Sequence, residues 1–270
     1  MSASINYHRG GEGPPLVLLH GVGLSWQIWA PVIALLEADF DVIACDSPGF
    51  GASAPLPRGV APTIPAYADA FEWFLAELGL ERPHVAGNSM GGAIALELAR
   101  SGAAGSATAF SPAGFWNRAE LRYAQLSLLS IARLPGALRP LWAALMRTRA
   151  ARAALLRQYF GDPLRIPAEE LQRTLAGVWS APAMVPAVEA FSQYSFGAAR
   201  ALRSTTVTIA WGRGDRLLPY RTQSRRARAQ LPWATHVTLG AGHVPFHDDP
   251  PACAEVIRAC VRRAREPARA

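Results

Sequence analysis

The stretch VAGNSMGGAIALELA, residues 85–99, decides the fold because it joins two structural patterns. PHVAGN (83–88) is a short apolar run typical of a buried strand, and a helix follows at once, from about Gly91 to Arg100. The polar pair Asn88-Ser89 stands where the strand ends. The sequence therefore places a hydroxyl group at an abrupt strand-to-helix turn.

Strands and helices alternate on both sides of this turn. The clearest helix is predicted over 66–80, where apolar residues recur at the spacing of one helix face. The last helix begins after Asp248-Asp249, an acidic pair that we expect to cap it ahead of two prolines. An edge hairpin is expected around His8. Apolar runs predict further strands at 15–20, 40–46, 106–112, 205–212 and 235–240. The alternation predicts an α/β fold, a mostly parallel sheet with helices on both faces.

One long segment breaks the alternation. Residues 114–200 show helical patterns, such as Leu171, Leu175 and Val178, with proline and glycine breaks and no convincing strand. This length far exceeds an ordinary connection. We therefore expect a helical cap over 114–200, inserted into a core formed by 1–113 and 201–270. Seven large apolar side chains are expected to roof a site, although each is more often cap core than pocket lining: Phe115, Trp116, Leu121, Leu128, Trp142, Met146 and Trp179.

The composition excludes several classes of partner. The net charge is +7, but every basic residue is arginine and no aromatic residues interleave with the arginine clusters, so a nucleic-acid partner is not expected. No apolar run approaches the roughly 20 residues of a membrane-spanning helix. The N-terminus lacks a signal-peptide pattern. The three cysteines, with no metal-ligand spacing, favour a reducing cytoplasm.

The turn at Ser89 has the pattern of a nucleophile. Residues 87–91 read G-x-S-x-G, which at a strand-to-helix junction forms an elbow with small neighbours where the backbones come close. The N–H of Met90 lies at the start of the helix, where the partial charge is positive. Val22 follows His20-Gly21 at the end of another strand. We expect the Val22 and Met90 N–H groups to form an oxyanion hole.

A serine hydroxyl needs a base to become a good nucleophile. Among six histidines, His243 is the best candidate, because it follows the last strand after a flexible glycine loop at the carboxyl edge of the sheet. His247, four residues later, could serve instead but lies beside the acidic cap of the last helix. His20 is expected to stabilise the oxyanion loop.

Asp215 is the expected acid. It lies in the loop after the preceding strand, three residues beyond Gly212. Asp46 more simply ties down its own glycine-rich loop, and the Asp248-Asp249 pair caps the last helix. The chain order Ser89, Asp215, His243 is the order expected for a triad mounted on this kind of sheet.

Five motifs make the chain similar to the α/β-hydrolase superfamily along nearly its whole length. They are His20-Gly21, DSPGFGAS (46–53), GNSMGG (87–92), WGRGDRLLP (211–219) and GAGHVPFHDDP (240–250). The resemblance implies the α/β-hydrolase fold, the Ser89-His243-Asp215 triad and no cofactor or metal. GNSMGG resembles the elbow of the meta-cleavage-product hydrolases, which cut carbon–carbon bonds. Those enzymes typically carry a tryptophan just after the catalytic histidine, where this sequence has Val244.

These features predict a serine hydrolase that cleaves an ester or related acyl bond of a small, largely apolar substrate. His243 would take the proton of Ser89, Asp215 would hold the imidazole, and water would release the acyl-enzyme. Carbon–carbon bond hydrolysis and acyl transfer could use the same residues. A non-catalytic protein that binds a small ligand on this scaffold is the alternative from another class.

Overall fold

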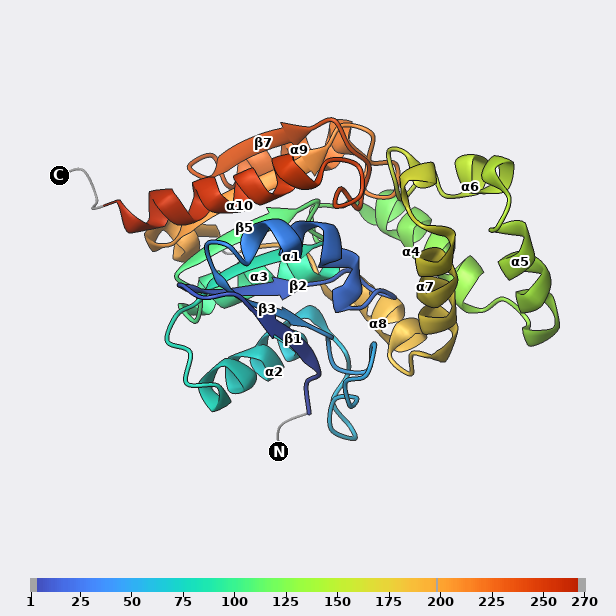
Figure 1. Cartoon of the computed structure of the whole chain (residues 1–270). Helices are drawn as coiled ribbons and strands as arrows, with labels where there is room; N and C mark the ends of the chain where they lie inside the picture. Colours follow the sequence, from blue (N-terminus) through green and yellow to red (C-terminus); the bar gives the residue numbers. More distant parts are fainter. Residues whose placement is uncertain (1–3, 198, 267–270) are drawn as a thin grey trace.

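One seven-stranded sheet forms the centre of the computed structural model, which describes residues 4–197 and 199–266 (Figure 1). Its strand order is β1-β3-β2-β4-β5-β6-β7. The strands are β1 (Tyr7–Gly10), β2 (Pro15–Leu19), β3 (Asp41–Cys45), β4 (His84–Asn88), β5 (Ser106–Phe110), β6 (Thr206–Gly212) and β7 (Thr235–Leu239). Only β1 pairs antiparallel in this sheet, so the predicted mostly parallel α/β sheet is confirmed.

The prediction of an edge hairpin around His8 is wrong, because β1 does not pair with the next strand along the chain. β1 lies at the sheet edge as expected, but it pairs with β3, with Tyr7 opposite Cys45. β2 is flanked by β3 on one side and β4 on the other, so it has no free edge for β1.

Helices cover both faces of the sheet, which explains why β2 to β6 are almost fully buried apolar runs. On one face, α1 (Ala30–Leu36) packs against α10 (Pro250–Arg265). The other face is covered by α2 (Ile64–Glu77), α3 (Met90–Ser101) and α9 (Tyr220–Gln230). Figure 1 shows the sheet between the two groups of helices, and each face buries its own hydrophobic core.

The α2 helix begins two residues earlier than the apolar spacing predicts and ends three residues earlier. The side chain of Thr63 accepts a hydrogen bond from the Ala66 N–H, and Pro65 occupies the first turn, so the start is fixed by capping. Gly79, at φ +67°, then turns the chain out of the helix.

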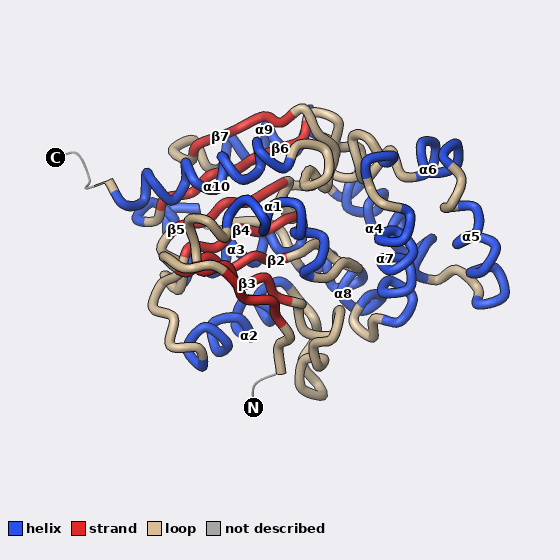
Figure 2. The backbone as a smooth tube through the Cα atoms, viewed as in Figure 1, coloured by secondary structure: helices blue, strands red, loops and turns tan. Residues whose placement is uncertain are grey.

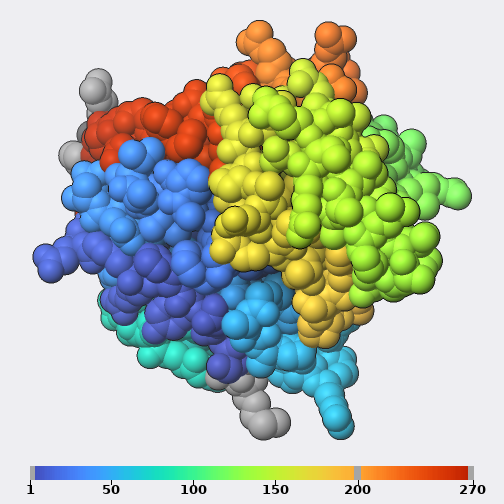
Figure 3. Space-filling model, turned by 45° about the vertical axis from the view of Figure 1, so that its right-hand side comes forward, coloured from blue at the N-terminus to red at the C-terminus, as the bar shows by residue number. Residues whose placement is uncertain are grey.

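Residues 114–200, called the inserted segment below, leave the sheet after β5 and return before β6. Their helices are α4 (Arg118–Ala132), α5 (Arg139–Leu145), α6 (Arg149–Leu155), α7 (Ala168–Ser180) and α8 (Met184–Ala190). No described residue of this segment belongs to a strand. In Figure 2 the strands gather on one side of the molecule and the inserted segment lies on the other. Figure 3 shows α7 and its neighbours against residues from the N-terminal half.

Candidate active site

Ser89 lies in a strained turn between β4 and α3. Its backbone has φ 56° and ψ −113°, a conformation that a residue with a side chain rarely adopts. The turn is held because the Ser89 N–H donates to the Phe110 carbonyl of β5 at 2.9 Å. The glycines around it are required by space, since a Cβ at Gly87 would lie 2.1 Å from the Gly91 carbonyl oxygen. The backbone therefore presents the Ser89 side chain at the carboxyl edge of the sheet.

His243 and Asp215 form a buried pair beside this turn. Asp215 Oδ2 lies 2.8 Å from His243 Nδ1, and both side chains are almost inaccessible to solvent. The other Asp215 oxygen accepts the N–H groups of Leu217 and Leu218 at 3.0 and 2.8 Å. With Nδ1 donating to the carboxylate, Nε2 is left as the acceptor of the ring.

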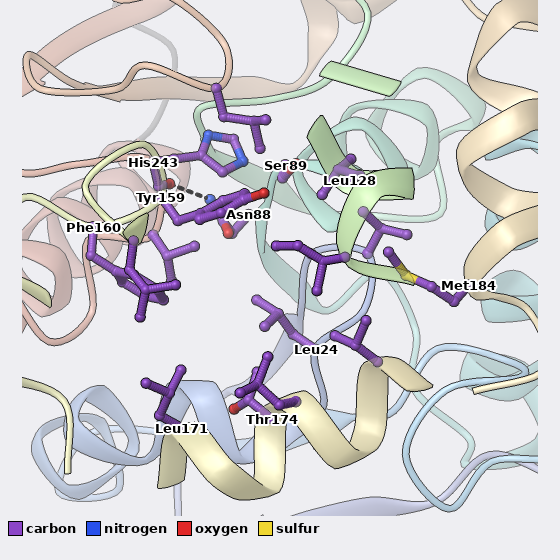
Figure 4. A pocket seen from close by; sticks show the side chains of 18 residues that line it. Leu24, Asn88, Ser89, Leu128, Tyr159, Phe160, Leu171, Thr174, Met184 and His243 are labelled. Atoms are coloured by element: carbon purple, nitrogen blue, oxygen red, sulfur yellow. Dashed lines mark hydrogen bonds between the residues drawn. The ribbon is translucent and has the colours of Figure 1, made fainter. Parts of the chain in front are cut away.

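Ser89 and His243 line the same pocket, and Figure 4 shows the imidazole on the Ser89 side of it. No hydrogen bond joins the Ser89 hydroxyl to His243 among the described residues. In enzymes without substrate such a bond is often long, and it shortens when the substrate binds. The sequence-predicted serine, histidine and aspartate are thus brought together in one place.

The loop after β2 passes next to Ser89. A Cβ at Gly21 would lie 3.3 Å from Ser89 Cβ, so the next residue, Val22, stands close to the serine. Neither the Val22 nor the Met90 N–H donates to an acceptor among the described residues. Both donors are therefore available to a negatively charged oxygen.

His20 fixes this loop, as predicted. Its Nδ1 donates to the Gly21 carbonyl at 2.7 Å, and its Nε2 accepts the Ser47 N–H at 2.9 Å. Complete burial lowers the pKa of His20, so the ring is neutral, as a nitrogen that accepts an N–H must be. Asp46 likewise ties down its own loop by accepting the Ala52 N–H at 3.0 Å.

His247 lies in a different environment from His243. Its Nε2 is 2.8 Å from Glu170 Oε1 on α7, and the residue is not part of the pocket lining. The structure thus places the second histidine candidate away from Ser89.

The prediction that both Asp248 and Asp249 cap α10 is wrong for Asp248. Asp249 is the cap and accepts the Ala252 N–H at 3.1 Å. The Asp248 carboxylate points the other way and binds backbone N–H groups of Gly242 and of the inserted segment. Only one residue can occupy the cap position, and the sequence pattern did not distinguish the two.

The pocket at Ser89 is a small cavity of about 90 Å³. The inserted segment supplies more than half of its lining (Figure 4). Apart from His243, no lining residue is ionisable near neutral pH. The lining residues are Gly21, Val22, Leu24, Asn88, Ser89, Leu128, Ile131, Leu156, Tyr159, Phe160, Leu171, Thr174, Leu175, Val178, Met184, Leu217, His243 and Val244.

Of the seven side chains expected to roof the site, only Leu128 lines this pocket. The other six lie in the two hydrophobic cores or pack against them. Phe115, for example, packs against Phe196 and Trp211. The three residues of the predicted helix pattern, Leu171, Leu175 and Val178, lie on one face of α7 and line the pocket.

Within residues 4–197 and 199–266, no group of three or more histidine, cysteine or acidic residues is arranged to hold a metal ion. The described helices include none that is both long and apolar enough to cross a membrane. All three cysteines are buried and free.

Known proteins are similar to this chain in sequence or in structure. The dihydrolipoyllysine-residue acetyltransferase component of an acetoin cleaving system from Cupriavidus necator is 31% identical over 254 residues, which cover 89% of this chain and 62% of that protein. An esterase structure from Rhodococcus sp. matches with 25% identity and a TM-score of 0.75, covering 96% of this chain and 95% of that one. A meta-cleavage product hydrolase from Pseudomonas fluorescens matches in fold, with 20% identity, a TM-score of 0.73 and coverage of 97% and 95%.

A family-level match covers most of the chain. The sequence pattern of the alpha/beta hydrolase family matches residues 16–256, which include β3 to β7 and all of β2 but its first residue. This range also includes the Ser89 turn, the Asp215–His243 pair and the whole inserted segment. The chain belongs to the alpha/beta hydrolase family.

Proposed function

We propose that this protein is a serine hydrolase that cleaves an ester or related acyl bond. The observation that carries the proposal is the buried 2.8 Å pair of His243 and Asp215 beside a serine held in a strained turn. His243 Nε2 accepts the Ser89 proton during attack on the substrate carbonyl, and Asp215 stabilises the imidazolium that forms. His243 then returns the proton to the leaving group, and water hydrolyses the acyl-enzyme.

The N–H groups of Val22 and Met90 bind the oxyanion in this proposal. Neither donor has a partner in the part of the chain that the structure describes. Val22 lies on the loop after β2, and Met90 stands at the N-terminus of α3, where the helix dipole adds positive charge. Removal of one such donor costs about 3 to 4 kcal/mol of transition-state stabilisation in known enzymes.

The substrate is proposed to be small, neutral and largely apolar. The pocket is lined by leucine, isoleucine, valine and aromatic side chains, and none of them could pair with a charged group on an acyl chain. Burying an unpaired charge there would be unfavourable by several kcal/mol. The similarity to the Rhodococcus esterase fits the same assignment.

The inserted segment is proposed to act as a cap domain over residues 114–200, with the core formed by 1–113 and 201–270. It supplies Leu128 and Leu171 to the pocket, so it determines which acyl groups fit. The three free, buried cysteines favour a reducing compartment such as the cytoplasm.

Hydrolysis of p-nitrophenyl esters of increasing chain length tests the proposal. Ser89→Ala and His243→Gln should each lower kcat by at least a thousandfold. His247→Gln is the matched control, because it makes the same change four residues away at a histidine bound to Glu170. Equal activity of wild type and Ser89→Ala, or a loss confined to His247→Gln, would contradict the proposal.

Carbon–carbon bond hydrolysis is the second candidate, favoured by the GNSMGG elbow and its resemblance to the meta-cleavage-product hydrolases. That reaction would use the same serine, histidine and oxyanion donors. Turnover of a ring-cleavage dienoate faster than any p-nitrophenyl ester would favour this candidate. Transfer of the acyl group to glycerol, measured as a glycerol ester, would instead reveal an acyltransferase.

A further inference from the structure

The Asp248 carboxylate is buried and binds three backbone N–H groups. Oδ2 accepts those of Gly242 and Gly161, and Oδ1 accepts that of Asp162, each at 2.8 Å. The residue is only 8% exposed. Burying a carboxylate is unfavourable unless hydrogen bonds replace its hydration. Three short charge-assisted bonds satisfy this carboxylate, and they join the loop before His243 to a loop of the inserted segment.

Three hydrogen bonds hold the backbone of residues 242–244 in place. Besides the Gly242 N–H bond to Asp248, the His243 carbonyl accepts the Asn88 side-chain amide at 2.9 Å (Figure 4). The Val244 N–H donates to the Tyr159 carbonyl at 2.9 Å. The peptides on both sides of the histidine are therefore fixed. The inserted segment makes one of the three bonds directly, through Tyr159, and its residues 161–162 share the Asp248 carboxylate that makes another.

The two loops pass so closely that no side chain fits between them at Gly242 or Gly161. A Cβ at Gly242 would lie 2.4 Å from the Gly161 nitrogen and 2.5 Å from the Phe160 carbonyl carbon. A Cβ at Gly161 would lie 2.8 Å from Asp248 Oδ2. Because backbone atoms of the two loops lie this close and share the Asp248 carboxylate, we expect a displacement of residues 159–162 to reach Gly242 and hence His243.

We propose that Asp248 is a positioning residue that sets the place of His243 relative to Ser89 by joining the His243 loop to residues 161–162. The effect of Asp248 on turnover rests on the proposed function, whereas its effect on the His243–Asp215 hydrogen bond does not. If Asp248 served only to attach the inserted segment, its loss would alter the pocket and leave the histidine unchanged.

The test compares Asp248→Asn with Asp249→Asn in the full-length chain. The first change keeps the shape of the side chain but replaces one acceptor oxygen by an N–H₂ group that faces backbone N–H donors. The second makes the same substitution one residue later, at the cap of α10. Gly161→Ala is a second variant, which crowds the carboxylate from the inserted segment and leaves Asp248 itself intact.

The first readout is the low-field proton NMR resonance of His243 Nδ1–H, assigned by its loss in His243→Gln. It needs no substrate. Asp248→Asn is expected to shift and broaden this resonance, and Gly161→Ala to do so more weakly, while Asp249→Asn leaves it unchanged. An unchanged resonance in folded Asp248→Asn and Gly161→Ala overturns the proposal, whatever the enzyme hydrolyses.

The second readout is kcat on p-nitrophenyl acetate and octanoate, with the pH profile of kcat/KM. Asp248→Asn is expected to lower kcat between about tenfold and a hundredfold, the loss typical of a misplaced catalytic group, by the same factor on both esters. The profile should also shift relative to Asp249→Asn. A loss confined to octanoate would overturn the proposal, because it would assign Asp248 to pocket shape. If wild type hydrolyses neither ester but the NMR resonance responds, the proposed function fails and the positioning role stands.

Discussion

Replacing Gly87 by alanine should disrupt the Ser89 turn, because no side chain fits between β4 and α3. The added Cβ would lie 2.1 Å from the Gly91 oxygen, 2.3 Å from the Gly91 carbon and 2.7 Å from the Gly92 nitrogen. All three are backbone atoms of the first turn of α3. No flexible side chain can rotate away, so the helix itself has to move.

The size of that movement follows from the contacts. Ordinary contact begins at 3.4 Å, so the start of α3 must retreat by about 1.3 Å. Overpacking of this kind destabilises proteins by about 1 to 3 kcal/mol. The same movement carries Ser89 and the Met90 N–H away from the pocket, and a displacement of about 1 Å at a reacting group costs roughly a hundredfold in rate.

Gly177→Ala provides the matched comparison. Gly177 lies within α7, its φ is not in the left-handed region, and a Cβ there would meet no atom within 4 Å. Alanine is favoured over glycine in a helix by about 0.5 to 1 kcal/mol. The same substitution should therefore stabilise the protein at residue 177 and destabilise it at residue 87.

Urea unfolding followed by circular dichroism measures both changes in the free energy of unfolding, and kcat on p-nitrophenyl butyrate measures the effect on the site. The expected pattern is a lower unfolding midpoint and a loss of turnover in Gly87→Ala only. If Gly87→Ala matched wild type in both stability and kcat, the reasoning about the tight turn would be refuted.

Three further outcomes follow from the buried groups and the pocket. Burial lowers the pKa of His20 in the folded state, so the unfolded chain binds a proton more readily than the folded protein. The free energy of unfolding should therefore fall as the pH drops below about 6.5, by up to about 1.4 kcal/mol per pH unit. In urea titrations between pH 6.5 and 5, His20→Gln should reduce this dependence on pH. Thiol reagents at pH 8 should label native protein slowly and urea-unfolded protein at three sites, counted by mass spectrometry, because Cys45, Cys253 and Cys260 are all buried. Leu128→Trp should fill the pocket and lower kcat/KM for octanoate far more than for acetate; an equal loss on both esters would contradict the assigned lining.

The sequence predicted the sheet and the clustering of Ser89, Asp215 and His243, because the deciding patterns are local. The central strands β2 to β6 are short buried runs, and each of these three residues lies one to four residues past the end of a strand. Parallel strands bring their carboxyl ends to one edge, so position along the chain is enough to predict proximity. The spacing of Leu171, Leu175 and Val178 predicted a helix, and these residues form the face of α7 that lines the pocket.

The role of Asp248 could not be predicted, because its partners Gly161 and Asp162 lie more than 80 residues away in the chain. The one available signal was that two adjacent aspartates preceded a helix that needs one cap. The pocket lining was also missed for a physical reason. Residue size was taken as the guide, but large aromatic groups such as Phe115 are the ones most strongly drawn into the core.

The inserted segment departs from β5 and returns to β6, which are neighbours in the sheet. The two ends of the segment therefore stay close together whatever sequence lies between them. The segment could in principle be exchanged for another to change the substrate specificity. The bonds around His243 set the condition for such an exchange. A transplanted segment would have to bring a backbone carbonyl in place of that of Tyr159 and two N–H groups in place of those of Gly161 and Asp162. Grafts chosen by pocket shape alone would alter the substrate range and lose turnover together.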